Sequence, residues 1–165
     1  MVFVWAYSRS MNRSLARGLV VMQFVLLFTL LVLPRGELWP SNVVVLAAVI
    51  ALAAAGLGLA LLGAIGLGRS LTASPIPRDN AQLVTSGVFA AVRSPIYTGL
   101  MMGGAALVLV GASVAHVLVW VALVVLLAVK TRWEERMLLV AHPAYRAYAL
   151  RVGRFLPGVG RLRAE

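Results

Sequence analysis

The chain has 165 residues, of which 62% are apolar and 12% are charged, and it contains no cysteine. Soluble domains have about 45–50% apolar and about 25% charged residues, so the composition excludes a soluble fold. It predicts a single all-α integral membrane domain over residues 1–165. The lack of cysteine excludes disulfides, thiolate metal sites and cysteine nucleophiles, and the net charge of +10 must flank membrane spans, so we expect no nucleic-acid partner.

Two apolar runs predict two N-terminal spans within residues 15–67. Residues 15–33 have an arginine-bearing start, with Arg9 and Arg13 before the run and Arg17 near its beginning, and they are about as long as the ~20 residues that a bilayer requires. No small-residue cleavage site follows them, so we expect this span to stay attached. Residues 43–67 form the second span, with Asn42 as its N-cap. Its small residues favour close helix packing: Ala51, Ala55, Gly56, Gly58, Gly63 and Gly66.

The second half of the chain predicts a helical hairpin. Residues 69–94 are polar and proline-containing, which argues against a continuous helix there. Residues 95–110 and 114–129 are apolar, but each would be only about 24 Å long against a hydrocarbon core of ~30 Å. We expect residues 87–92 and 130–135 to lengthen them at either end. The prediction is therefore about four transmembrane helices, with a C-terminal helical hairpin and a helical tail.

The basic residues predict the topology. Of the 15 lysines and arginines, all but Arg35 fall at the amino terminus, in the middle loop or in the tail. The positive-inside rule therefore places both termini and the middle loop on the cytoplasmic side of a multi-pass membrane protein. All five acidic residues lie outside the apolar runs, which disfavours a proton-coupled carrier. His116 is the one ionisable residue inside a run, and we expect it to hydrogen-bond a neighbouring helix rather than to bind a metal.

The first stretch whose polar residues could form a functional site is residues 83–99. Ser94 before Pro95 predicts an N-cap followed by proline at the first helical position. The helix would then begin with unpaired backbone N–H groups, and such an end attracts anions. A capped helix beside Arg93 at the membrane interface explains the same residues without any ligand.

The second stretch follows the hairpin. Glu134 and Glu135 should lie about 100° apart on their helix, so that one points back at the hairpin while the other pairs with arginine in solvent. Two further pairs are spaced by three residues: Tyr145 with Tyr148, and Arg151 with Arg154. We expect each pair to share a helical face and to form an aromatic and cationic wall beside the membrane. Such a wall can by itself bind anionic lipid headgroups.

Together the two stretches resemble the isoprenylcysteine carboxyl methyltransferases and the phospholipid N-methyltransferases, which are integral membrane enzymes that use S-adenosylmethionine. The resemblance covers residues 83–157. It is carried by Arg93, Pro95, Tyr97, Gly99, Glu134, Glu135, Leu138, Tyr145, Tyr148 and Val152. The chain departs from the family pattern at three places: Ser94 replaces a histidine, Ala141-His142 replaces Phe-Gly, and Gly153 replaces a proline.

The resemblance implies a cofactor pocket between the cytoplasmic end of the hairpin and the tail. Its implied residues are Arg93, Ser94, Tyr97, Glu134, Glu135, Tyr145 and Tyr148. Arg151 or Arg154 would position a carboxylate acceptor, whereas an amine acceptor would lose a proton to Glu134 or Glu135. The hypothesis we favour at this point is methyl transfer to a lipidic or prenylated carboxylate that enters from the bilayer, with Arg151, Arg154 and Glu135 as catalytic residues. The alternatives are N-methylation of a phospholipid amine, and a non-catalytic membrane protein of the same fold that binds lipid or a partner.

Overall fold

The structure is a computed structural model that describes residues 2–68 and 83–162, with the side chains of the first helix described from residue 14 onward. Within these ranges the chain is helical and has no β-strand, which confirms the predicted fold class. The elements are α1 (Val2–Val32), α2 (Val43–Leu67), the 3-10 helix η2 (Gly87–Ala90), α3 (Pro95–Gly111), α4 (Val114–Ala141) and α5 (Tyr145–Arg151). The expectation for the polar segment falls largely on residues 69–82, outside the described part.

Within the described ranges, three helices are long and apolar enough to cross a membrane. They are Ser14–Val32 within α1, Val43–Leu67 and Val114–Ala141. The remaining apolar helix, α3, has 17 residues. These long apolar helices make the chain an integral membrane protein, as the composition predicted.

The two helices of the hairpin differ in whether they extend beyond their apolar runs as expected. α4 continues through residues 130–135 as expected and ends only at Ala141. The expected extension of α3 by residues 87–92 is wrong, because η2 is a separate turn. Ser94 interrupts the helix with φ −128° and ψ 58°, and a residue before proline is disfavoured in the α conformation.

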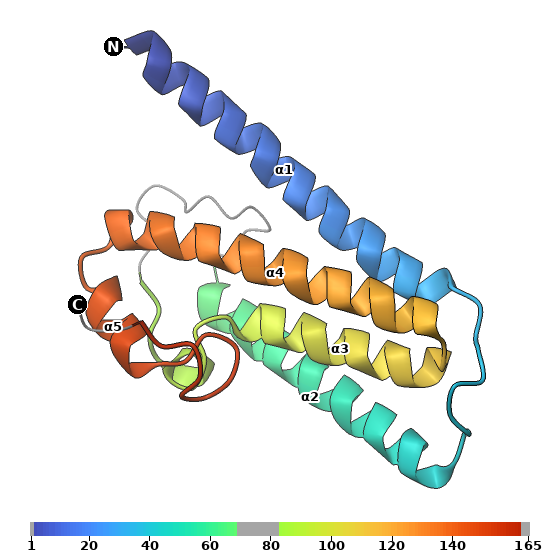
Figure 1. The fold of residues 1–165 in the computed structure, drawn as a ribbon. Coiled ribbons are helices and arrows are strands. Elements are labelled where there is room, and N and C mark those ends of the chain that lie inside the picture. Colours follow the sequence, from blue (N-terminus) through green and yellow to red (C-terminus); the bar gives the residue numbers. More distant parts are fainter. Residues whose placement is uncertain (1, 69–82, 163–165) are drawn as a thin grey trace.

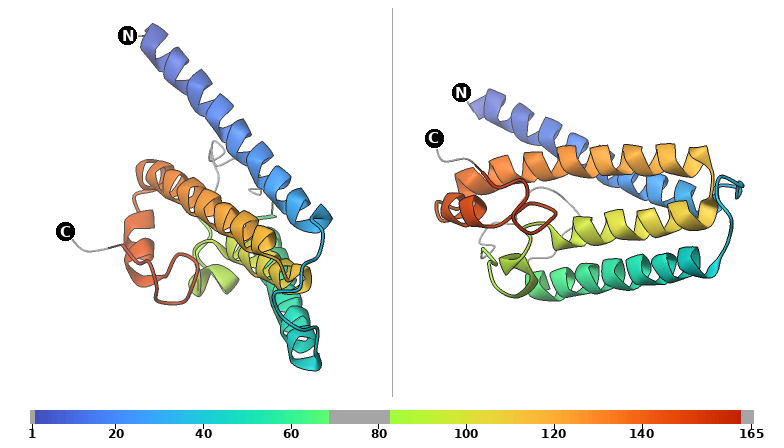
Figure 2. Two further views of the ribbon diagram at one scale, coloured as in Figure 1. Left: turned by 45° about the vertical axis from the view of Figure 1, so that its right-hand side comes forward. Right: turned by 60° about the horizontal axis from the view of Figure 1, so that its bottom comes forward.

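The four long helices lie in the spatial order α2, α3, α4 and α1 (Figures 1 and 2). Glycines bring α2 and α3 close together, since a Cβ added to Gly99 would lie 2.4 Å from the Gly56 carbonyl oxygen. Gly63 likewise faces Ile96, with only 2.8 Å available to a Cβ. The prediction that the small residues of α2 serve close packing is confirmed at these positions. Gly58, by contrast, faces open space.

α1 contacts the bundle along a narrow stripe. Its buried residues Ala16, Gln23 and Leu30 recur every seven positions, and Leu30 packs against Leu123 and Leu127 of α4. Its other faces expose large apolar side chains, which suits contact with lipid. Towards its amino terminus α1 diverges from α4 (Figure 1).

Among the described residues His116 hydrogen-bonds the cap of its own helix and not a neighbouring helix, so that prediction is wrong. Its Nδ1 lies 2.7 Å from the Oγ of Ser113, which caps the same helix α4. The ring occupies the space beside Gly111, where an added Cβ would come within 2.2 Å of it. The histidine therefore completes the α3–α4 turn, and the loop after α1 joins this turn when Gly36 donates its N–H to the Gly111 carbonyl at 2.8 Å.

Candidate active site

The tail of the chain pairs with the segment that precedes α3. The backbone N–H of Arg93 donates to the Gly153 carbonyl at 2.9 Å, and that of Ser94 donates to the Arg154 carbonyl at 3.1 Å. Gly153 has no room for a side chain, because a Cβ there would lie 2.0 Å from the Leu156 carbonyl oxygen. This pairing places Arg154 next to the start of α3, although the two are distant in sequence.

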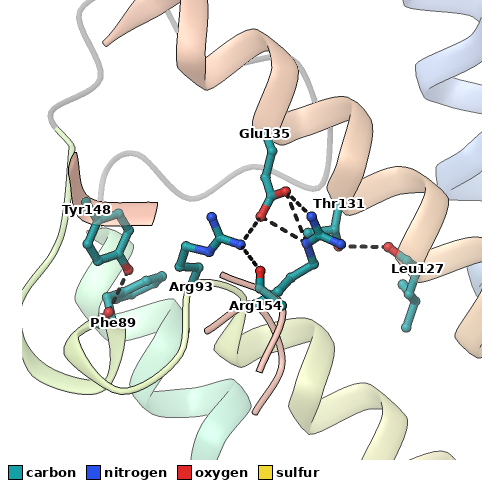
Figure 3. Close-up of polar contacts among 8 residues, drawn as sticks. Phe89, Arg93, Leu127, Thr131, Glu135, Tyr148 and Arg154 are labelled. Atoms are coloured by element: carbon teal, nitrogen blue, oxygen red, sulfur yellow. Dashed lines mark hydrogen bonds and ion pairs between the residues drawn. The ribbon is translucent and has the colours of Figure 1, made fainter. Parts of the chain in front are cut away.

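The pairing builds the first of two polar groups, which we name the tail cluster: Arg93, Glu135, Arg154, Tyr145 and Tyr148. Glu135 lies between the two arginines (Figure 3). Its Oε1 is 3.0 Å from Arg93 Nη2, and its Oε2 is 2.6 Å from Arg154 Nη2. We expected the arginine-paired glutamate to lie in solvent, and this is wrong, because the returning tail leaves Glu135 only 5% exposed.

Arg93 has unused hydrogen-bonding capacity. Its side chain is 1% exposed, and its Nη2 also donates to the Gly160 carbonyl at 2.7 Å. Its Nε and Nη1 are buried and have no hydrogen-bond partner in the part of the chain that the structure describes. A buried donor left unsatisfied costs about 1–3 kcal/mol, so an acidic or carbonyl oxygen of a ligand would be stabilised here.

The two tyrosines face inward rather than forming a wall beside the membrane. Tyr145 and Tyr148 are 3% and 5% exposed and meet edge to face, with ring centroids 5.8 Å apart. The Tyr148 hydroxyl donates to the Phe89 carbonyl at 2.5 Å (Figure 3). Burial raises the pKa of Tyr148 to about 12 and raises that of Tyr145 as well, despite the nearby Arg93. Both rings are therefore neutral at physiological pH and present aromatic surface to the cluster.

Arg151 and Arg154 do not share a helical face, so that prediction is also wrong. α5 ends at Arg151, and the following Val152 has an extended backbone. Arg151 is exposed and donates from Nε to the Ala147 carbonyl at 3.3 Å, whereas Arg154 turns inward to Glu135. The two arginines therefore cannot act together on one substrate group.

The second polar group lies on a different face of α4, and we name it the span cluster: Gln23, Tyr97, Lys130 and Glu134. The Tyr97 hydroxyl donates to Glu134 Oε1 at 2.5 Å. Lys130 Nζ donates to Gln23 Oε1 at 2.9 Å and lies 5.0 Å from the centroid of the Tyr97 ring. The cluster thus joins α1, α3 and α4.

Gln23 and Lys130 were not among the predicted site residues. Both are buried, with 7% and 1% exposure. A signal for them existed, because Gln23 interrupts an apolar run and Lys130 is the first charge after one, and polar groups at such positions are expensive. What the sequence could not supply was their pairing across 107 positions.

Ser94 holds the N-cap position that the sequence predicted, and Pro95 is the first residue of α3. Its side chain, however, makes no capping hydrogen bond, so the predicted hydroxyl cap is wrong. Its carbonyl instead accepts from both the N–H and the hydroxyl of Thr98, at 3.0 and 3.1 Å. The hydroxyl of Thr98 also lies 3.0 Å from the Phe155 carbonyl, which ties the tail to α3.

The predicted cofactor residues are thus divided between two places. Arg93, Glu135, Tyr145 and Tyr148 belong to the tail cluster, Tyr97 and Glu134 belong to the span cluster, and Ser94 adjoins Arg93 at the start of α3. The division arises because successive residues of a helix point about 100° apart, which places the two glutamates on different faces of α4.

These features define a helical membrane protein with buried polar chemistry at one end of a hairpin. A family model described as phospholipid methyltransferase matches residues 43–143, and the chain belongs to this family. The resemblance stated from the sequence is confirmed, and the chain is by family a membrane methyltransferase. Comparisons with curated proteins and with solved structures gave no match.

Proposed function

We propose that the chain transfers a methyl group from S-adenosylmethionine to the amine of a phospholipid in the surrounding bilayer. The observation that carries the proposal is the buried Arg93 guanidinium, whose Nε and Nη1 have no partner among the described residues. These donors suit the carboxylate of the cofactor's methionine moiety, since charge-assisted hydrogen bonds to a carboxylate are strong.

The tail cluster fits the rest of this cofactor. Glu135 holds Arg93 in place through the 3.0 Å ion pair. The neutral rings of Tyr145 and Tyr148 lie beside Arg93 and favour a bound cation by cation–π contact. When bound, S-adenosylmethionine would supply an electrophilic methyl group whose bond to sulfur breaks, leaving the electron pair on sulfur, as the acceptor's lone pair forms the new bond.

The arrangement favours an amine over the carboxylate that we preferred from the sequence alone. A carboxylate acceptor needs a positive residue, but Arg154 is already paired with Glu135 and Arg151 faces solvent. An amine acceptor needs a group that takes its proton. Glu134 offers a carboxylate inside the helical part of the molecule, positioned by Tyr97, and we assign it this role. The description of the family as phospholipid methyltransferase supports the same choice.

The topology is part of the proposal. We propose that α3 crosses the bilayer with the three long helices and that both termini lie in the cytoplasm, since all basic residues except Arg35 would then share that side. A carboxy-terminal alkaline phosphatase fusion should be inactive in cells, and a green fluorescent protein fusion should fluoresce. An active phosphatase fusion would reverse the orientation.

The proposal is tested with purified protein. We expect S-adenosylmethionine to bind in detergent by calorimetry, and labelled methyl to appear on phosphatidylethanolamine, but not on a prenylcysteine analogue, in lipid nanodiscs. Arg93→Lys should weaken cofactor binding about tenfold, or about 1.4 kcal/mol, while the exposed control Arg151→Lys should leave it unchanged.

Each other outcome is informative. A parent protein that binds no S-adenosylmethionine rejects the proposal. Binding without transfer to any acceptor favours the non-catalytic alternative, and label on the prenylcysteine carboxylate restores the acceptor we first favoured.

A further inference from the structure

We propose that Gln23 of α1 and Lys130 of α4 are a pair of positioning residues, which fix an ammonium group near Glu134 so that its carboxylate stays ionised and can take the proton of the acceptor amine. This inference rests on the proposed function, because that function assigns proton transfer to Glu134. It also gives a role to α1, which lies outside the matched residues 43–143.

Lys130 is a cation in a place that packing alone does not explain. Its side chain is only 1% exposed, and Leu127 on the preceding turn of α4 is fully buried. Withdrawing an ammonium from water costs several kcal/mol unless other groups compensate for the lost hydration. A charged residue buried in a membrane helix is therefore a candidate for a functional role.

Two partners hold the Lys130 ammonium without neutralising it. Its Nζ donates to Gln23 Oε1 at 2.9 Å and lies 5.0 Å from the centroid of the Tyr97 ring. An amide oxygen and an aromatic face both stabilise a cation, but neither carries an opposite charge. The ammonium is attracted electrostatically to Glu134, which follows Lys130 by four residues on the same face of α4.

The charged and titratable groups around Glu134 come from α3 and α4. Tyr97 of α3 donates its hydroxyl to Glu134 Oε1 at 2.5 Å, and Lys130 adds a positive charge from the preceding turn of α4. Glu135 also acts on Glu134, but its own charge is balanced by the two arginines of the tail cluster. From α1 comes the neutral Gln23.

The ammonium decides whether Glu134 can act as a base. A carboxyl group that is withdrawn from water is favoured in its neutral form, which has no capacity to accept a proton. A nearby positive charge favours the anion instead. With Lys130 in place, the proton of the acceptor's ammonium can pass to a Glu134 oxygen, and the lone pair that it leaves on nitrogen can attack the methyl group.

Gln23 fixes the position of this charge. It is 7% exposed and belongs to the buried stripe of α1, seven residues from both Ala16 and Leu30, so packing restricts its side chain. A neutral amide suits the role because it accepts the hydrogen bond and leaves the charge of Lys130 free to act on Glu134. A glutamate at position 23 would neutralise the ammonium and weaken that effect.

Two substitutions remove the influence of the charge in different ways. Lys130→Met deletes the ammonium and keeps an unbranched chain, whereas Gln23→Glu keeps the ammonium and its hydrogen bond but adds a competing carboxylate. The measurement is kcat for methyl transfer to phosphatidylethanolamine in nanodiscs as a function of pH. In both variants, the pH at which kcat reaches half its plateau should rise by about one unit or more, so that kcat at lower pH falls about tenfold. The Kd for S-adenosylmethionine should stay that of the parent. Arg132→Met removes an exposed cation of the same helix as the control and should leave the pH profile unchanged.

Infrared spectroscopy gives a readout that does not need activity. The C=O stretch of protonated Glu134 is the band that Glu134→Gln removes, and we expect its titration to move to higher pH in Lys130→Met. A titration that does not move would overturn the pair and leave the proposed function intact. The parent's pH profile in Gln23→Glu would also overturn it, because a purely structural role tolerates a hydrogen-bonding glutamate. A moved titration in a protein that transfers no methyl group would instead retain the pair and reject the proposed function.

Discussion

The tail cluster and the span cluster use two adjacent glutamates of α4 in opposite ways. Glu135 is enclosed by two arginines and has its charge balanced, so it serves to hold Arg93 and the returning tail together. Glu134 accepts a hydrogen bond from the Tyr97 hydroxyl instead, and in the proposed function it is the group that takes the proton of the acceptor. The comparison shows that one step of about 100° along a helix is enough to give identical neighbours different chemistry.

Both clusters also depend on parts of the chain outside the matched family region. The matched residues 43–143 supply Glu134 and Glu135. Gln23 completes the span cluster from α1, and Arg154 completes the tail cluster from beyond α5. The matched region therefore carries three of the four residues of the span cluster and two of the five residues of the tail cluster, and the flanking segments supply the remaining partners.

Removing the charge of Glu135 should have the largest effect on stability. In Glu135→Gln the buried guanidinium of Arg93 loses its counter-charge, and breaking a buried pair in this way costs about 3–5 kcal/mol. Thermal unfolding in detergent should show a strongly lowered Tm. The exposed neighbour provides the control, since Arg136→Gln should leave Tm unchanged. A Glu135→Gln protein as stable as the parent would mean that the tail cluster does not hold the tail in place.

Removing the Tyr97 hydroxyl should lower catalysis without weakening cofactor binding, and so distinguish the role of the span cluster from that of the tail cluster. In Tyr97→Phe the carboxylate of Glu134 loses its donor, which should cost about 1–3 kcal/mol of unfolding free energy. Because Tyr97 positions the proposed proton acceptor, kcat for methyl transfer should also fall, and the calorimetric Kd for S-adenosylmethionine should stay that of the parent. A weakened Kd with unchanged kcat would move Tyr97 to the cofactor site.

Tyr148→Phe is the corresponding change in the tail cluster, and we expect it to be milder. It removes one hydrogen bond to the Phe89 carbonyl, which is worth about 0.5–1.5 kcal/mol of stability. The ring itself remains, so cofactor affinity and kcat should both be kept. If kcat falls as far as in Tyr97→Phe, the two tyrosines do not have the distinct roles that the clusters assign to them.

The helices could be predicted because local signals mark their ends. The predicted bounds of α2 agree with the structure, since Asn42 accepts from the Val45 N–H at 2.9 Å and Gly68 ends the helix with φ 47°. The split between the glutamates also followed from helical geometry alone. Both inferences use only residues that are close together in the chain.

Which residues make up each cluster could not be predicted, because the contacts within a cluster join residues that are far apart in the chain. In a membrane helix nearly every face is apolar, so hydrophobic periodicity does not show which helices are neighbours. The contact of Gln23 with Lys130 therefore has no local signal, although each residue alone is conspicuous. Arg154 was assigned to a helical face because nothing in its vicinity indicates that α5 ends at Arg151 and that the chain then turns back.

The smallest expected effect on stability concerns Ser94, which adjoins the tail cluster. Its hydroxyl makes no capping bond, so Ser94→Ala should stay within about 0.5 kcal/mol of the parent in unfolding free energy. Thr98→Val is the matched control, and it should be less stable because it loses the bond that ties α3 to the Phe155 carbonyl.

Since Ser94 lies beside Arg93 and its hydroxyl is not used as a cap, we expect it to donate to the cofactor. Ser94→Ala should then weaken S-adenosylmethionine binding by about 0.5–1.5 kcal/mol, which is roughly two- to twelvefold, and Ser94→His should restore a donor. Titration and thermal unfolding on the same samples decide the matter: unchanged affinity in both variants, together with lowered stability of Ser94→Ala, would make Ser94 a structural residue.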